Sequence, residues 1–365
     1  MAERRIILLQ NVCPDYRQEP FSLLREHWGD QLEIYAGLVS FDPTARTQVE
    51  LPGCLQIIRN YFFFNRRLLW QHGVIRKVIA SDVAILELNP RNLTTWTILF
   101  ARRVLRRYTV VWGHAWPREG PGASTDRLRH RMRRLANVLL VYTETQRLEL
   151  LSLMPNAQIY AAPNALYRRD EMSATTTDTP TNIVFVGRLI PSKKPTLLLE
   201  GFARAVARGL QPDYNLVFAG DGPERSKIEA TLEEMPELCK RVTLLGQIPS
   251  SQVQDIYRNA IVSVSPGYVG LSITQSFSFG VPMIIARDEP HAPEIEAAVD
   301  GSNSVFVPSN APEALADAIL EVVDQSTSWL GQRESIVLDC SARYTVEKMA
   351  EGIITAAESD KVARR

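Results

Sequence analysis

Residues 263–300 read SVSPGYVGLSITQSFSFGVPMIIARDEPHAPEIEAAVD. An alternating apolar run leads into two glycines, Gly267 and Gly270, and an amphipathic segment at 271–279 follows them. This order predicts a strand, a glycine turn and a helix, with a second strand at 283–286. A helix that follows a parallel strand through a glycine turn presents unpaired backbone N–H groups and the positive end of its dipole. The stretch therefore predicts a phosphate-bearing ligand at the start of that helix.

Short apolar runs alternate with helical patterns along the whole chain, which is typical of parallel, doubly wound sheets. Two such series, joined by a segment without hydrophobic periodicity, predict an α/β protein with two Rossmann-like domains that face a central cleft. The expected strands are 5–10, 32–38, 83–88, 108–112, 137–142 and 158–161 in the first half, and 183–186, 215–219, 242–245, 261–264, 283–286 and 304–307 in the second.

The same patterns set the expected domain boundaries. The first domain is expected at 1–166, and a linker rich in Thr, Asp and Arg at 167–181. The second domain is expected at 182–345, and a helix at 346–365 that folds back on the first domain.

Composition is that of an ordinary globular protein: 365 residues, 45% hydrophobic and 22% charged. The first residues lack the core of a signal peptide, and no run approaches the roughly 20 apolar residues of a membrane-spanning helix. The four cysteines have no metal-binding spacing, which predicts reduced thiols in a cytoplasmic protein.

The net charge of zero conceals an asymmetry between the two halves. Residues 1–175 hold 24 Lys and Arg against 16 Asp and Glu, so the remaining residues carry a matching negative excess. Ten arginines lie between Arg102 and Arg134. A basic half could meet nucleic acid, anionic lipid or a phosphorylated acceptor. Nucleic acid is disfavoured because no recognition motif accompanies the charge.

Four motifs follow one another in the second half. VGRLIPSKK stands at 186–194, AGDGPE at 219–224, VTLLG at 242–246, and the opening stretch comes last. In this order they resemble the retaining family-4 glycosyltransferases of the GT-B fold, over essentially all of 182–319. Any one of these motifs alone would be a weak signal.

Arg188 and Lys193 are the basic residues of the first motif. A guanidinium and an ammonium beside a helix start can neutralise a diphosphate leaving group, and the resemblance implies that role for both. The alternative is a pair of solvated surface charges. The expected donor-binding residues are Gly187, Gly222, Tyr268, Gly270, Leu271, Ser272 and Gln275, although Gly222 is also explained by a simple turn.

The opening stretch departs from the family pattern, in which two glutamates separated by seven residues contact the sugar and the ribose. Alignment on Gly270 places Gly267 and Gln275 at these positions, so neither carboxylate is present. An amide can still bond ribose hydroxyls. Glu294 is the first candidate to replace the sugar-binding carboxylate, with Asp288 and Glu289 as alternatives. The change resembles a family subset with a G-x-V-G-L loop.

The first half offers a second set of candidates. His114 lies just past the strand at 108–112, where the resemblance implies a histidine that touches the donor sugar; a structural histidine is the alternative. Asn11, Tyr16 and Arg17 follow the first strand and are the expected acceptor-side residues.

Aromatic residues stand beside basic ones at 61–70, YFFFNRRLLW. Together with the arginines after residue 101, they predict either a patch for anionic lipid on the inner face of a membrane or a core helix with a solvated flank.

The combined hypothesis is a retaining, metal-independent glycosyltransferase that moves a hexose-type sugar from a nucleoside-diphosphate donor, with UDP and GDP as the first choices and no further cofactor. The acceptor would be a saccharide or a lipid-linked hydroxyl compound in polysaccharide, glycolipid or other glycoconjugate synthesis. Rival hypotheses are an epimerase or hydrolase that uses the same donor site, and a non-catalytic sugar-nucleotide-binding protein. A Rossmann oxidoreductase is disfavoured because no strand is followed by GxGxxG.

Overall fold

A computed structural model describes residues 4–117 and 120–363 of the chain. The chain divides into two compact units. One unit runs to Ala165 and includes the C-terminal helix α14 (Val346–Ala363), and the other spans Leu166–Thr345. The segment expected as a linker lies within the second unit, where the Thr177 amide donates to the carbonyl of Arg258 at 3.0 Å.

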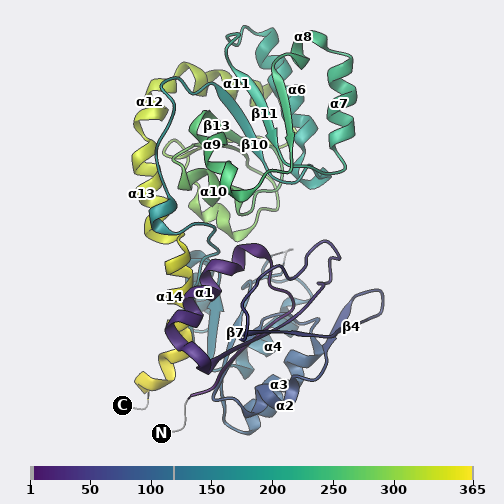
Figure 1. Cartoon of the computed structure of the whole chain (residues 1–365), viewed down its shortest axis with the longest axis vertical. Coiled ribbons are helices and arrows are strands. Elements are labelled where there is room, and N and C mark those ends of the chain that lie inside the picture. The colour runs from purple at the N-terminus through teal and green to yellow at the C-terminus, as the bar shows by residue number, and fades with distance from the viewer. Residues whose placement is uncertain (1–3, 118–119, 364–365) are drawn as a thin grey trace. The chain divides into compact units, whose positions relative to one another are not determined.

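The first unit is built on a seven-stranded parallel sheet with the order β3-β2-β1-β6-β7-β8-β9 (Figure 1). Its central strands are buried apolar runs, as expected for a sheet covered on both faces. The strands are β1 (Ile6–Gln10), β2 (Leu32–Gly37), β3 (Leu55–Ile58), β6 (Val83–Glu87), β7 (Tyr108–Trp112), β8 (Val138–Val141) and β9 (Gln158–Ala161).

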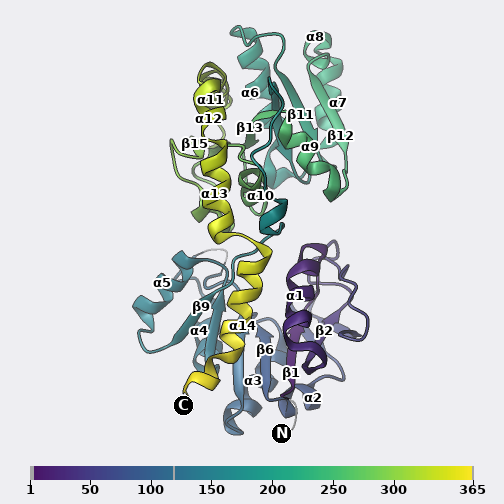
Figure 2. The same cartoon turned by 60° about the vertical axis from the view of Figure 1, so that its left-hand side comes forward.

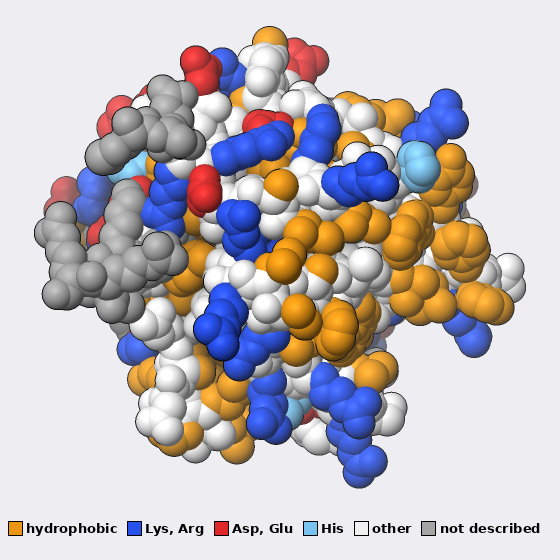
Figure 3. Space-filling model, turned by 90° about the horizontal axis from the view of Figure 1, so that it is seen from below, with side chains coloured by type: hydrophobic (Ala, Val, Ile, Leu, Met, Phe, Trp, Pro, Cys, Tyr) orange, Lys and Arg blue, Asp and Glu red, His pale blue; other side chains and the backbone are white. Residues whose placement is uncertain are grey.

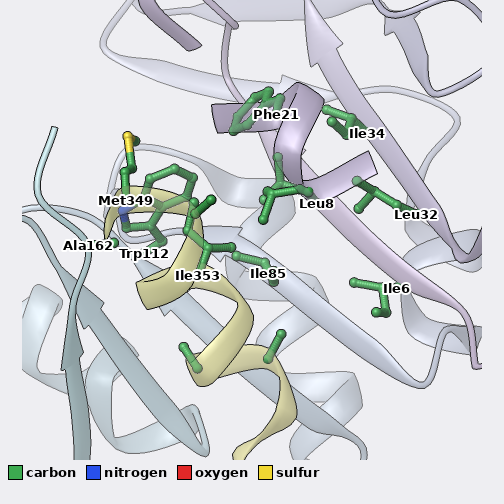
Figure 4. Packing of buried hydrophobic residues seen from close by; sticks show 14 of the residues in the cluster. Ile6, Leu8, Phe21, Leu32, Ile34, Ile85, Trp112, Ala162, Met349 and Ile353 are labelled. Carbon is green, nitrogen blue, oxygen red and sulfur yellow. The ribbon is translucent and has the colours of Figure 1, made fainter. Parts of the chain in front are cut away.

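Alternation along β1 separates the two cores of this unit. Ile6 and Leu8 pack on one face with α1 (Gln18–Trp28) and α14, while Ile7 and Leu9 pack on the other. Figure 4 shows Trp112 and Met349 of the first of these cores. The opposite face is covered by α2 (Ile75–Ala80), α3 (Leu93–Val104), α4 (Asp126–Leu135) and α5 (Glu144–Leu153).

The C-terminal helix lies against the first sheet at close range (Figure 2). A Cβ built on Gly352 would lie 2.3 Å from the carbonyl oxygen of Ala161, so only glycine permits this approach of helix to strand. The Tyr108 hydroxyl adds a hydrogen bond of 2.8 Å to the Ala356 carbonyl. The last helix is therefore an integral part of the first unit.

The second unit repeats the design with a six-stranded parallel sheet of order β12-β11-β10-β13-β14-β15. Its strands are β10 (Asn182–Val186), β11 (Asn215–Ala219), β12 (Val242–Gly246), β13 (Ala260–Ser265), β14 (Met283–Ala286) and β15 (Ser304–Val307). Its helices are α6 (Pro195–Ala207), α7 (Arg225–Glu233), α8 (Pro236–Cys239), α9 (Val253–Arg258), α10 (Ser272–Ser278), α11 (Pro312–Asp324), α12 (Ser326–Gly331) and α13 (Arg333–Arg343). The expected fold class, two Rossmann-like α/β domains, is confirmed.

Strand order reverses once in each sheet. The reversal falls between β1 and β6 in the first unit and between β10 and β13 in the second. In open parallel sheets, ligands bind at the carboxyl ends of the strands beside such a reversal. The topology therefore selects two edges, which Asn11 and Glu87 border in the first unit and Gly187 and Gly267 in the second.

The aromatic and basic stretch at 61–70 forms a hairpin, so the expectation of a core helix is wrong. Strand β4 (Asn60–Phe63) pairs with β5 (Leu68–Gln71) in an antiparallel ladder. Its turn has three consecutive residues with positive φ from Phe64 to Arg66, and Phe64 is 76% exposed. Aromatic residues favour strands, and here they form a short ladder in place of the expected helix.

No helix of the described residues is both long enough and apolar enough to cross a bilayer. All four cysteines are free; Cys13, Cys54 and Cys340 are buried and Cys239 is exposed.

Arg102, counted with the basic stretch, is fully buried inside the first unit. Its guanidinium ties the end of α2 to the starts of β6 and β7. The partners are the carbonyls of Val78 (2.6 Å), Ile79 (3.1 Å), Ser81 (2.9 Å), Asp82 (3.2 Å) and Tyr108 (2.5 Å) and the hydroxyls of Ser81 (3.1 Å) and Thr109 (2.9 Å). Its role is therefore to satisfy strand and helix ends.

We predict that Arg102→Ala destabilises the protein by at least about 3 kcal/mol, because several buried acceptors lose their donor at once. The neighbouring Arg103 is exposed. Arg103→Ala should therefore change the free energy of unfolding by less than about 0.5 kcal/mol. Urea unfolding followed by circular dichroism measures both; equal midpoints for the two variants would contradict the structural role of Arg102.

Candidate functional site

Two glycines bring backbones into contact at the carboxyl edge of the second sheet. Gly187 and Gly220 follow β10 and β11 with φ of 142° and 148°. A Cβ on Gly220 would lie 1.9 Å from the Gly187 carbonyl oxygen, and one on Gly222 would lie 2.4 Å from the Leu189 carbonyl oxygen. These contacts fix the turn that carries Arg188 and, beyond it, Lys193.

Lys193 ends the 3₁₀ turn Pro191–Lys193 and lies over Gly187, with Nζ 3.6 Å from the position a Cβ would take there. Its Nζ donates a long hydrogen bond of 3.4 Å to the Tyr268 carbonyl. Burial, together with the positive charge of the nearby Arg188, lowers the pKa of Lys193 to about 8. Among the residues that the structure describes, neither cation has a carboxylate partner. Two neighbouring cations without a counter-ion favour an anionic ligand.

The loop Gly267–Gly270 is held from two sides. The Tyr268 amide donates to the Ser192 carbonyl at 2.8 Å on one side. On the other, the Val269 amide donates to Nδ1 of His291 at 3.1 Å, and the Ala292 amide donates to the Val269 carbonyl at 2.9 Å. The loop is therefore positioned before any ligand arrives.

His291, which sequence reasoning missed, is fixed as one tautomer by these bonds. Because Nδ1 accepts from the Val269 amide, Nε2 carries the proton and donates to the Ala286 carbonyl at 2.7 Å. Burial lowers the pKa of His291 and keeps the ring neutral. The only sequence signal was its position in the loop after β14.

Backbone donors lie open where the loop meets α10. Within the described part of the chain, no acceptor bonds the amides of Gly270, Leu271 and Ser272. Tyr268 borders them, with its ring 3.5 Å from the position of a Cβ on Gly270. Most of the predicted donor-binding residues are thus brought together with Arg188 and Lys193 at one strand edge.

The replacement for the missing carboxylates is less simple than the sequence indicated. A Cβ on Gly267 would lie 2.5 Å from the Ser192 carbonyl oxygen and 2.8 Å from the Lys193 carbonyl carbon. No side chain fits at this position, so a glutamate could not stand there without moving the loop. The close approach of the Ser192–Lys193 backbone, and not the loss of a carboxylate alone, explains why glycine stands at position 267.

Gln275 and the candidate acidic residues have the following places. Gln275 donates to the Tyr167 hydroxyl at 3.0 Å, so one of its donors is already engaged. Glu289 forms an ion pair with Lys194 at 2.5 Å, and Asp288 is exposed in the same loop. Glu294 lies in the 3₁₀ segment Pro293–Ala297 with 3% exposure. Their roles in sugar binding stay predictions.

A polar cluster occupies the strand reversal of the first unit. Asn11 follows β1, and its backbone N–H donates to Oε2 of Glu87 at 3.1 Å. Asn89 donates to Oε1 of the same carboxyl at 3.2 Å. Burial raises the pKa of Glu87, while these bonds and the charges of Arg17 and Arg129 act to lower it. Sequence reasoning missed Glu87, although a charged residue ending an apolar strand was a usable signal.

Arg17 and His114 meet around Tyr142 in this cluster. Arg17 is 4% exposed, stacks over the Trp112 ring at 4.1 Å and donates to the Tyr142 hydroxyl at 3.2 Å. Its Nη1 is buried without a partner among the described residues. The His114 ring lies 4.7 Å from that of Tyr142. Desolvation by the surrounding protein and the nearby charges of Arg129 and Arg17 lower the pKa of His114 to about 4, so the imidazole is neutral near pH 7 although the residue is exposed.

Tyr16 borders this cluster in the 3₁₀ turn Asp15–Arg17, with the Arg17 guanidinium 5.2 Å from its ring centre. The three acceptor-side candidates and His114 thus lie at one edge of the first sheet. Among the described residues, no group of three or more His, Cys, Asp or Glu side chains is arranged to hold a metal ion.

Comparison with known proteins points to a family for the second unit. Residues 168–336, nearly all of that unit, match the family model described as Glycosyl transferases group 1. The second unit is thus similar to this group. The D-inositol 3-phosphate glycosyltransferase of Corynebacterium diphtheriae is 29% identical to this chain over 184 residues, which cover 47% of this chain and 42% of that protein. The chain thus matches less than half the length of this relative.

Another relative is the GDP-mannose-dependent alpha-(1-6)-phosphatidylinositol dimannoside mannosyltransferase of Mycobacterium tuberculosis, 29% identical over 153 residues, covering 40% of this chain and 37% of that one. Among solved structures, HepE of Anabaena in complex with UDP matches with a TM-score of 0.70 at 14% identity, over 99% of this chain and 100% of that one. The pneumococcal O-GlcNAc transferase GtfA with UDP and GlcNAc matches with a TM-score of 0.68 at 11% identity, over all of both chains. At such identities the likeness concerns the fold alone.

We predict that Gly267→Ala lowers the free energy of unfolding by about 1–3 kcal/mol, because the new methyl group overlaps the Ser192 and Lys193 backbone. Gly270→Ala is the matched control, since its Cβ would meet nothing closer than 3.5 Å. Thermal unfolding of the two variants tests the packing. A Gly267→Ala protein as stable as Gly270→Ala would show that the loop is free to move.

Proposed function

We propose that the chain is a glycosyltransferase that transfers a hexose-type sugar from a nucleoside diphosphate to a hydroxyl acceptor. One observation carries this proposal: the cations of Arg188 and Lys193 lack a described counter-ion at the strand reversal of a group 1 glycosyl transferase unit. A diphosphate supplies the missing negative charge, and it carries more charge after the glycosidic bond to it breaks than before. The two cations therefore stabilise the leaving group more than the bound substrate.

We call the groups at this edge of the second sheet the donor half-site, and the cluster around Glu87 in the first unit the other half-site. The remaining groups of the donor half-site can hold the nucleotide sugar. Amides of Gly270, Leu271 and Ser272 can bond phosphate oxygens, and the free oxygen of Gln275 can accept from a ribose hydroxyl. We propose UDP or GDP as the nucleotide, because solved neighbours hold UDP and one relative is named for GDP-mannose. We also propose retention at the anomeric carbon without a metal, with a leaving phosphate oxygen taking the acceptor proton.

The first unit supplies groups for the donor sugar and for the acceptor. Neutral His114 can donate or accept a hydrogen bond without bringing a charge to the sugar, and Glu87 can bond a hydroxyl pair. We propose a saccharide or lipid-linked acceptor. The relatives named above act, by their names, on D-inositol 3-phosphate and on phosphatidylinositol dimannoside, which are polyhydroxylated compounds of this kind.

Nucleotide binding is the direct test of the donor site. We predict that UDP or GDP raises the unfolding temperature of the native chain, and that ADP and dTDP do so less. Lys193→Ala and Arg188→Ala should each lower sugar transfer by about a hundredfold or more while leaving the fold intact. No stabilisation by any nucleotide would overturn the proposal and favour a non-catalytic protein, and donor conversion without acceptor would favour an epimerase or hydrolase.

The pH dependence of binding makes this test specific to Lys193. A bound diphosphate favours the ammonium form and so raises the Lys193 pKa from about 8 in the free protein. Nucleotide affinity should therefore fall as the pH rises through about 8, with proton uptake on binding in that range. Lys193→Arg should remove this dependence, because a guanidinium keeps its charge. Calorimetry in buffers of different ionisation enthalpy measures the uptake.

The hairpin of the first unit supports peripheral contact with an anionic membrane. Tyr61, Phe63 and Phe64 are exposed on it, and Arg67 is exposed beside them. We predict that sedimentation with phosphatidylglycerol vesicles captures the protein, and that Phe64→Ser weakens capture several-fold without changing stability. Equal capture by neutral phosphatidylcholine vesicles, or of the variant, would contradict this role.

A further inference from the structure

A cavity of about 900 Å³ opens on the edge of the first unit opposite to the polar cluster around Glu87. Its walls include Tyr108, Asn137 and Gln158, which lie at the amino ends of β7, β8 and β9. Ligand sites of doubly wound sheets lie at the carboxyl ends of strands. This cavity therefore has no part in either half-site described above.

The lining of the cavity is strongly basic. Arg103, Arg106, His130 and Arg134 line it, and no Asp or Glu is among its described lining residues. Within the described ranges, none of these four side chains forms a hydrogen bond or an ion pair. Arg133 also lines the cavity but is paired with Asp126 at 2.6 Å. The three guanidinium groups repel one another unless an anion joins them.

The uncharged polar groups also present donors. Oδ1 of Asn137 accepts from the Thr109 amide at 2.9 Å, and Oε1 of Gln158 accepts from the Ser359 hydroxyl at 3.5 Å. Each amide oxygen is thus engaged inside the protein, which leaves the NH₂ groups for a ligand. Leu153 and Met154 add an apolar wall. The cavity therefore fits a molecule that carries phosphate on an organic body.

Helix ends offer a competing explanation for the charges. Arg103 and Arg134 stand in the last turns of α3 and α4, where cations stabilise the helix dipole. Arg106 does not fit that explanation, because it adopts φ of 53° just past α3, where glycine is the usual residue. A side chain in this conformation costs about 1 kcal/mol relative to glycine. The chain keeps an arginine there at a cost in stability.

We propose that this cavity is a second anion site, which binds a phosphate-bearing molecule through Arg103, Arg106 and Arg134. The ligand is either a soluble phosphate ester or the headgroup of an anionic lipid, since both present the same oxygens. Figure 3 shows Lys and Arg side chains among hydrophobic ones over the face seen from below. The site is independent of the proposed sugar transfer.

The first test uses inorganic pyrophosphate as the probe. Calorimetry is carried out on a Lys193→Ala background, which silences the proposed donor half-site. We expect binding to survive in this background and to weaken about tenfold or more in Arg103→Gln/Arg134→Gln. Arg127→Gln/Arg131→Gln is the matched control. Both arginines are exposed on α4 and do not line the cavity, and their substitution removes the same two positive charges. Equal loss of affinity in both double variants would overturn the proposal.

The second test separates a binding role from a helix-end role. Arg106→Gly should raise the unfolding temperature, because it relieves the left-handed conformation, and yet weaken pyrophosphate binding several-fold. A variant with unchanged affinity would show that the arginine has no ligand and would overturn its place in the site.

Vesicles then distinguish the two sources. If phosphatidylglycerol vesicles capture the Lys193→Ala protein more than the Arg103→Gln/Arg134→Gln variant in that background, and pyrophosphate competes, the site holds a lipid headgroup. If pyrophosphate binds through these arginines but vesicle capture does not depend on them, the ligand is a soluble phosphate ester. If neither pyrophosphate binding nor vesicle capture depends on these arginines, the proposal is overturned.

Discussion

Direct contact between backbones is the constraint on which the second half-site depends. Gly187, Gly220 and Gly267 lie where a Cβ would come within 4 Å of neighbouring atoms, and at Gly220 and Gly267 it would overlap another chain segment. The contacts at Gly220 and Gly267 leave no room for side chains at the strand reversal, and the Lys193 ammonium over Gly187 donates to the Tyr268 carbonyl. Hydrogen bonds from Val269 to His291 and from Ala292 to Val269 fix the other side of the loop Gly267–Gly270. Rigid donors around a ligand site lower the cost of organising it when charge develops.

The parallel sheets could be predicted from the sequence because their strands are buried on both faces and read as continuous apolar runs. Strand β3 and the β4–β5 hairpin were not, since both are short and partly exposed, with polar residues between the apolar ones. Local propensity in such segments is decided by neighbours that lie far away in the sequence. The hairpin illustrates this, because its first residue is fixed by distant partners. The side-chain NH₂ of Asn60 donates to the carbonyl and side-chain oxygens of Asn11 and to the carbonyl of Val39.

Site residues divide in the same way. Arg188 and Lys193 could be found because they lie within one short motif at the end of one strand. Glu87 could not be found as a partner of Asn11, since 76 residues separate them and only strand order brings them together. The crowding at Gly267 was equally hidden, because a sequence shows that a carboxylate is missing but not that Ser192 and Lys193 occupy its space. Sequence patterns identify chemistry within an element, and topology assembles it between elements.

The arginine-rich stretch of the first unit shows why charge counts need burial. Arg102, Arg129 and Arg133 donate to carbonyls inside the unit, so they stabilise its loops and strand ends and leave little charge for a partner. Arg103, Arg106 and Arg134 are exposed around one cavity and stay uncompensated by the described residues. The arginines of this stretch therefore fall into a structural set (Arg102, Arg129 and Arg133) and a recognition set (Arg103, Arg106 and Arg134). Because the recognition set lies at the amino ends of the strands, a ligand there would not compete with one held at the carboxyl ends, and the unit can occupy both edges at once.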